Sequence, residues 1–111
     1  SDVYKRQVFA QTKFVICRSG ASTVAELQTY AMPAIFIPIL NSIDDHQTVN
    51  AKNACKNGGG IYLSEKSFSE DLFLKEITSF YNSDLNKRSK NMFNDIHKDA
   101  ASRIANEIKQ N

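Results

Sequence analysis

The chain has 111 residues, of which 41% are hydrophobic and 23% are charged, a composition typical of one soluble globular domain and too short for two. Fourteen basic against twelve acidic residues give a net charge of +2, and the basic residues are scattered, so we expect no nucleic-acid partner. No apolar run approaches the roughly 20 residues that cross a bilayer, so we expect a soluble, cytosolic chain.

The first seven residues fit no periodic pattern. We expect residues 1–7 to be a leader foreign to the fold, and we place the domain at residues 8–111. The first predicted element is a strand at 14–17, because this run is continuously apolar, contains β-branched residues and is bounded by polar residues.

The next elements alternate between helix and strand. Apolar residues at helical spacing predict helices at 23–31 and 46–57, which end before a proline and at a glycine respectively. Short apolar runs predict strands at 34–37 and, more weakly, at 61–63. This order is the signature of parallel βαβ units, so we predict an α/β fold with a Rossmann-like parallel sheet and flanking helices.

After residue 64 the pattern changes to C-terminal helices. Apolar spacing predicts three of them, at 69–81, 84–97 and 99–109. Ser69 is placed to act as the N-cap of the first.

Cys17 and Cys55 are the only cysteines, and they are far apart in the sequence. No CxxC pair and no Cys/His cluster occurs, so we expect neither a disulfide nor a metal site. We expect both thiols to be small buried hydrophobic groups. No HExxH motif, phosphate-loop lysine or serine–histidine–aspartate order is present.

Two loops carry the candidate functional residues. Loop 18–23 follows the first predicted strand, and loop 41–47 follows the second. Ligands of open parallel sheets bind at the carboxyl ends of the strands, and right-handed crossovers bring both loops to the same edge of the sheet. If the two strands are neighbours, we expect the loops to hold one ligand between them.

The first loop is rich in small residues and opens a helix. Backbone N–H groups at about 22–24 would be unpaired and suited to phosphate oxygens, while Gly20 and Ala21 let a ligand approach the main chain. Glu26 could accept hydrogen bonds from the two hydroxyls of a ribose. These features describe a site for a nucleoside diphosphate. The alternative is that Thr23 and Glu26 form a capping box and only satisfy the helix end.

The second loop offers groups suited to a sugar. Gln47, and with it His46 or Asp45, could bind sugar hydroxyls through amide, imidazole or carboxylate groups, and Asn50 lies one turn further on the same face. The alternative is again a capping box, here formed by Asp44 and Gln47.

Four blocks of sequence, and the tail at 92–108, resemble in order and spacing the C-terminal domain of the MurG family of bacterial UDP-N-acetylglucosamine transferases. The blocks are CRSGASTVAE at 17–26, MPAIFIP at 32–38, DDHQ at 44–47 and NA at 50–51. The resemblance covers roughly residues 8–109. Each block alone is weak, and the ordered set is specific.

The resemblance implies the C-terminal, donor-binding half of a GT-B glycosyltransferase, incomplete at its N-terminus. Residues matching Ala21 to Thr23 would hold the diphosphate of UDP-N-acetylglucosamine, Glu26 its ribose and Gln47 its sugar, while His46 stands where relatives can have another glutamine. No cofactor and no metal are implied. The substrate-binding residues implied are Ser19, Gly20, Ala21, Ser22, Thr23, Val24, Ala25, Glu26, His46, Gln47 and Asn50.

The implied reaction moves N-acetylglucosamine, with inversion, to the lipid-linked acceptor undecaprenyl-pyrophosphoryl-MurNAc-pentapeptide, at the cytoplasmic face of the bacterial membrane. The N-terminal half, which would bind this acceptor and supply the catalytic base, is not in the sequence. We therefore expect the chain to be inactive alone, to bind UDP-N-acetylglucosamine with much reduced affinity and to leave one sheet edge unpaired.

Two alternatives remain at this point. The chain could be a separate donor subunit of a two-chain UDP-N-acetylglucosamine transferase. It could also be a non-catalytic nucleotide-binding module, in which Glu26 and Gln47 serve only as helix caps.

Overall fold

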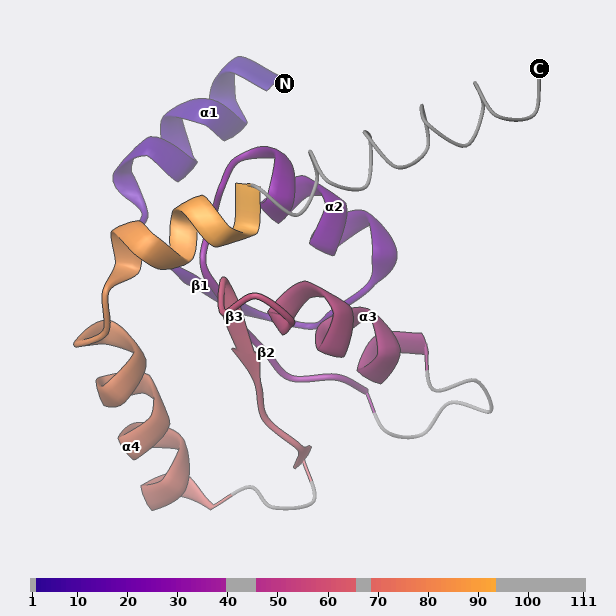
Figure 1. The fold of residues 1–111 in the computed structure, drawn as a ribbon, viewed down its shortest axis with the longest axis vertical. Helices are drawn as coiled ribbons and strands as arrows, with labels where there is room; N and C mark the ends of the chain where they lie inside the picture. The colour runs from indigo at the N-terminus through magenta and orange to yellow at the C-terminus, as the bar shows by residue number, and fades with distance from the viewer. Residues whose placement is uncertain (1, 40–45, 66–68, 94–111) are drawn as a thin grey trace.

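The computed structural model describes residues 2–39, 46–65 and 69–93. Within these ranges three strands form one parallel sheet in the order β1-β2-β3, so each strand lies next to its neighbour in the sequence (Figure 1). The strands are β1 (Val15–Cys17), β2 (Ala34–Phe36) and β3 (Gly60–Tyr62). The predicted parallel arrangement of strands is confirmed, and β1 and β3 form the edges of the described sheet.

Two helices connect the three strands, as predicted, and others flank the sheet (Figure 1). The helices are α1 (Asp2–Gln11), α2 (Ala21–Thr29), α3 (His46–Cys55), α4 (Glu70–Tyr81) and a further helix over 85–93. The remainder of the two predicted C-terminal helices lies outside the described residues. No helix within the described part of the chain is long and apolar enough to cross a membrane.

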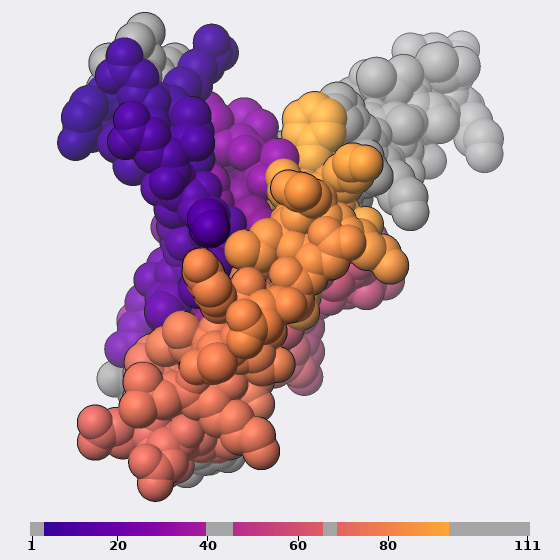
Figure 2. Space-filling model, turned by 90° about the vertical axis from the view of Figure 1, so that its left-hand side faces the viewer, coloured from indigo at the N-terminus to yellow at the C-terminus, as the bar shows by residue number. Residues whose placement is uncertain are grey.

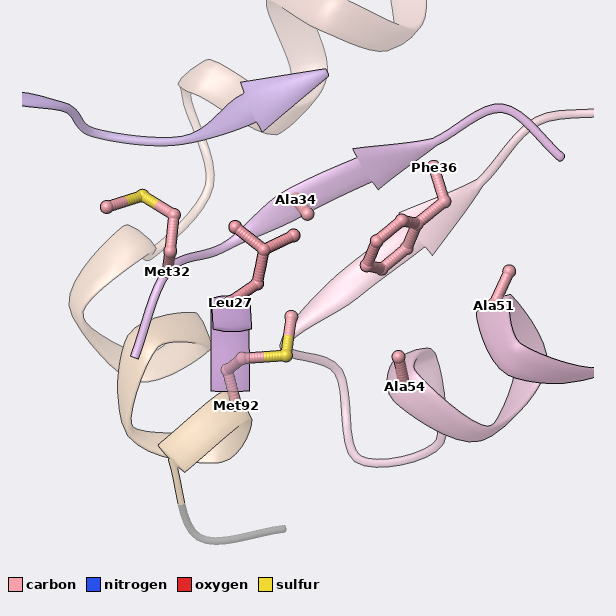
Figure 3. Packing of buried hydrophobic residues seen from close by; sticks show 7 residues of the cluster. All are labelled: Leu27, Met32, Ala34, Phe36, Ala51, Ala54 and Met92. Carbon is pink, nitrogen blue, oxygen red and sulfur yellow. The ribbon is translucent and has the colours of Figure 1, made fainter. Parts of the chain in front are cut away.

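The hydrophobic core lies between β2 and the helices on one face of the sheet (Figure 3). Ala34 and Phe36, two positions apart on β2, lie on the same face of the sheet and belong to this core. Small residues of α3 allow that helix to approach the strand closely. Met92, from the helix over 85–93, enters the same core. Its members are Leu27, Met32, Ala34, Phe36, Ala51, Ala54 and Met92.

Helix α1 is the main element that the sequence pattern did not predict. Residues 2–7, for which we expected no regular structure, form its first part. The helix has little amphipathic character, and its anchor is Phe9, whose ring lies 4.9 Å from the ring of Tyr30 between centroids. A single aromatic contact at the end of a polar segment gives no periodic signal. That residues 1–7 are foreign to the domain stays a prediction.

A hollow of about 540 Å³ separates α1 from the start of the helix over 85–93, on the face shown in Figure 2. Phe9, Tyr30, Asp84 and Ser89 are among its lining residues. This hollow lies at the amino end of the strands, because its wall includes Pro33, which immediately precedes β2. It is therefore at the opposite edge of the sheet from the candidate loops.

Helix α2 ends two residues earlier than predicted, in a Schellman turn. Ala31 adopts a left-handed conformation with φ of 55° and donates its N–H to the carbonyl of Gln28 at 3.2 Å. The N–H of Met32 donates to the carbonyl of Leu27 at 2.8 Å. This turn satisfies the end of the helix before the proline is reached, and glycine is its usual left-handed residue.

Ala31→Gly should therefore stabilise the fold by about 0.5–1 kcal/mol. Left-handed backbone costs an alanine about 1–2 kcal/mol, which exceeds the roughly 0.4–1 kcal/mol of added entropy in the unfolded chain. Urea unfolding measures the difference. Ala25→Gly, on the exposed side of the same helix, is the control and should lower the stability by about 1 kcal/mol. Equal destabilisation by both changes would contradict the left-handed conformation of Ala31 in this turn.

Candidate functional site at the carboxyl edge of the sheet

The structure brings the end of β1 and the start of α3 into direct contact. The Ser19 hydroxyl donates to the backbone carbonyl of Gln47 at 2.6 Å, and the Asn50 side-chain amide donates to the backbone carbonyl of Ser19 at 3.0 Å. Because β1 and β2 are neighbouring parallel strands, these segments lie together at the carboxyl edge of the sheet. Loop 18–23 therefore lies beside Gln47, the end of the second predicted loop, and residues 41–45 of that loop lie outside the described residues.

The N-terminus of α2 is open to solvent at this edge. Gly20 is the N-cap, no side chain caps the helix, and the first helical hydrogen bond runs from the N–H of Val24 to the carbonyl of Gly20. The N–H groups of Ala21, Ser22 and Thr23 precede that bond, and all three residues are exposed. The unpaired amides expected at 22–24 thus lie one residue earlier, because α2 begins at Ala21. They carry the positive end of the helix dipole.

Neither packing nor backbone conformation requires glycine at position 20. Its φ of −64° and ψ of 153° suit any residue, and a Cβ added there would meet no atom within 4 Å. Within the described ranges, the space beside Gly20 and the exposed first turn of α2 is therefore open to a ligand.

The capping-box interpretation of Thr23 and Glu26 is wrong. A capping box needs its acid at the third helical residue, whereas Glu26 is the sixth residue of α2. The Glu26 carboxylate instead forms an ion pair with Lys5 of α1, at 3.1 Å between Oε1 and Nζ. The two side chains are 33% and 50% exposed, so this pair contributes little to stability.

The side chain of Gln47 is oriented by the backbone of the segment after β2. Its Oε1 accepts from the N–H of Ile39 at 3.0 Å. A backbone N–H can only donate, so this bond fixes which end of the amide is oxygen and leaves the Nε2 group as the donor. Gln47 is the second residue of α3 and follows the exposed His46. Asp44 and Asp45, including the capping role considered for Asp44, lie outside the described residues.

The structure does not gather all candidate residues around one hollow. A second cleft, of about 490 Å³, lies beside the same sheet edge and is lined by Ile16, Cys17, Arg18, Ile37 and Glu65. Neither Glu26 nor Gln47 lines it. Arg18 donates to the carbonyl of Ile37 at 3.1 Å and forms an ion pair with Glu65. The sequence analysis did not predict this link, and its one signal in the sequence is an arginine directly after a predicted strand.

The cysteines and the acidic groups show no reactive or metal-binding arrangement in the described ranges. Cys17 and Cys55 are free and partly buried. Burial raises the pKa of the Cys17 thiol, and it raises the pKa of Cys55 to about 12 against a smaller opposing effect of Arg88. No group of three histidine, cysteine or acidic residues could hold a metal ion among the residues searched.

Comparisons with known proteins identify the family of the chain. A model of the family described as glycosyltransferase family 28 C-terminal domain matches residues 5–104. A UDP-N-acetylglucosamine–N-acetylmuramyl-(pentapeptide) pyrophosphoryl-undecaprenol N-acetylglucosamine transferase of Ruminiclostridium cellulolyticum is 37% identical over 106 residues, which cover 94% of this chain and 29% of that protein. The enzyme of the same name from Paramagnetospirillum magneticum is 42% identical over 81 residues, or 73% of this chain and 21% of that protein.

The fold is also that of a solved relative. The crystal structure of Acinetobacter baumannii MurG matches with a TM-score of 0.71 and 23% sequence identity, over 95% of this chain and 30% of that one. This likeness confirms the predicted Rossmann-like fold. The chain thus spans less than a third of the length of each of these three proteins.

Proposed function

Since the chain belongs to the glycosyltransferase family 28 C-terminal domains, we propose that it binds UDP-N-acetylglucosamine as the donor half of a peptidoglycan glycosyltransferase. The observation that carries the proposal is the contact between Ser19 and the first turn of α3. This contact sets an open helix N-terminus, suited to a diphosphate, beside an amide group suited to a sugar.

Each part of the donor has a matching group at this edge. The N–H groups of Ala21 to Thr23 bind the diphosphate oxygens, and the Glu26 carboxylate accepts from the ribose hydroxyls. The Nε2 group of Gln47 donates to an oxygen of N-acetylglucosamine. As UDP leaves, negative charge grows on the diphosphate, and the fixed dipoles of the α2 N-terminus stabilise it without rearranging. No cofactor is needed for this step.

The acceptor and the proton transfer belong to other parts of the enzyme. The names of the two sequence relatives include an undecaprenol-linked acceptor. By analogy, the hydroxyl of such an acceptor displaces UDP with inversion at the cytoplasmic face of the membrane. The base that activates this hydroxyl comes from outside the present chain, so the chain alone binds donor and does not transfer sugar.

Substitution of Gly20 tests the diphosphate contact. Gly20→Ser should weaken UDP-N-acetylglucosamine binding by at least about tenfold, because the new side chain occupies the space that the phosphate oxygens need and costs them at least one hydrogen bond to the positive helix end. The free energy of unfolding should stay equal or rise by about 0.3 kcal/mol, because serine is a good N-cap. Titration calorimetry and urea unfolding measure the two effects.

Gly20→Ala is the matched variant, because it adds the Cβ without the capping hydroxyl. It should also weaken donor binding. Wild-type affinity in both variants would contradict a phosphate in front of the α2 N-terminus.

A further inference from the structure

We propose that Ser19 and Asn50 are positioning residues, which align the two halves of the donor site and do not themselves contact the donor. This inference rests on the proposed function, because it concerns how that site is assembled. It changes the role that the sequence resemblance implies for both residues, which is direct contact with the substrate.

Ser19 has no surface through which it could bind a ligand. It is 0% exposed and is the one polar residue among the fully buried side chains of the described ranges. Its hydroxyl hydrogen is used by the Gln47 carbonyl, and its own carbonyl accepts from Asn50. A buried hydroxyl without a hydrogen bond costs folding free energy, so the Gln47 carbonyl stabilises Ser19 in the local fold.

The two hydrogen bonds run in opposite directions between the same two segments. Ser19 donates toward α3, and Asn50, three residues after Gln47 on that helix, donates back toward Ser19. The core packing of Ala51 and Ala54 holds α3 against the sheet. The reciprocal pair adds two restraints at different points of the helix, which align its first turns with the loop that leads into α2.

Gln47 is the residue whose position depends on this pair. Its backbone carbonyl is held by Ser19 and its side-chain oxygen by the N–H of Ile39. The direction of its remaining Nε2 group is therefore set by contacts on both sides. Loss of the Ser19–Asn50 pair would shift the sugar-binding amide relative to the phosphate-binding amides, and leave the α2 N-terminus itself intact.

The consequence is a specific change in ligand preference. UDP needs only the α2 N-terminus and Glu26, whereas UDP-N-acetylglucosamine also needs Gln47 in the correct place. A variant without the pair should bind UDP as the wild type does and should lose the added affinity that the sugar provides. A purely structural defect would weaken both ligands equally.

The experiment compares Asn50→Ala with Asn53→Ala in the full chain. Asn53 lies three residues further along α3 and is exposed, so its change is a matched control. Ser19→Ala removes the other bond and provides an independent variant. Dissociation constants for UDP and for UDP-N-acetylglucosamine are measured for each protein, with circular dichroism to establish that each is folded.

We expect Asn50→Ala and Ser19→Ala to lower the preference for UDP-N-acetylglucosamine over UDP by about 3- to 10-fold, the effect of one lost hydrogen bond. UDP affinity should change by less than about twofold, and Asn53→Ala should change neither value. Three results would overturn the positioning role alone: an unchanged preference in both folded variants, an equal loss for both ligands, or a lost preference in Asn50→Ala while Ser19→Ala keeps it. The last result would indicate a direct contact of Asn50 with the sugar. Failure of the wild-type chain to bind either nucleotide would overturn the proposed function, and this role with it.

Discussion

Replacing Glu26 with glutamine should weaken UDP-N-acetylglucosamine binding by about 10- to 150-fold. Hydrogen bonds to a charged group contribute roughly 1.5–3 kcal/mol, and a ribose diol would lose its carboxylate acceptor. Glutamine keeps the size of the side chain, so the packing of α2 stays the same. The fold should lose little stability, because Glu26 is not a helix cap and its ion pair with Lys5 is partly exposed. Titration calorimetry measures the affinity.

Lys5→Ala is the matched control for this change. Both variants break the same ion pair, and only Glu26→Gln removes the carboxylate. Lys5→Ala should bind the donor at least as tightly as the wild type, because the ribose no longer competes with an ammonium group for Glu26. Equal weakening by both variants would mean that the ion pair, rather than a ribose contact, is what matters.

Gly60→Ala should destabilise the fold by about 1–3 kcal/mol, or prevent folding. A Cβ at this position would lie 2.6 Å from the backbone carbonyl oxygen of Ala34 and 3.3 Å from the ring of Phe36. The carbonyl belongs to the central strand, which is fully buried, so it cannot move without disturbing the β2–β3 pairing. Thermal unfolding followed by circular dichroism measures the loss.

Gly20→Ala serves as the control for the stability measurement, because a Cβ there meets nothing within 4 Å. It should melt above Gly60→Ala and lose at most about 1 kcal/mol, because alanine is a poorer N-cap than glycine. If Gly60→Ala and Gly20→Ala have the same melting temperature, the close approach of β3 to β2 does not constrain the fold.

The parallel sheet could be predicted because its signals are local. The run 34–37 is continuously apolar, and the strand it predicts is buried on every residue. The N-cap at Ser69 was likewise predictable and is confirmed, since its hydroxyl accepts from the N–H of Leu72 at 3.2 Å. Buried strands and side-chain caps depend on residues close together in the sequence.

The start of α2 was misjudged because glycine gives no positive capping signal. Thr23 and Glu26 have the spacing of a capping box, and that pattern places the helix start at Thr23. The chain instead turns at Gly20, whose extended backbone lets the helix begin at Ala21. Spacing alone could not separate a cap from a site residue, because both require the same residue types near a helix start.

The contacts that assemble the site could not be predicted at all. The Ser19–Asn50 hydrogen bond spans 31 positions, and the Ser19–Gln47 bond spans 28. Such pairs become visible only when the crossover connections have brought the strand ends to one edge. The sequence predicted which segments meet, and the structure shows which atoms hold them together.

Amide chemical shifts of the ¹⁵N-labelled wild-type chain, titrated with UDP-N-acetylglucosamine, show where the donor binds. We expect saturable shifts to centre on the backbone amides of Ala21 to Thr23, Glu26 and the side-chain amide of Gln47. UDP should leave the Gln47 side chain unchanged. Shifts confined to the hollow between α1 and the helix over 85–93, or no saturable shift at all, would contradict the proposed donor site.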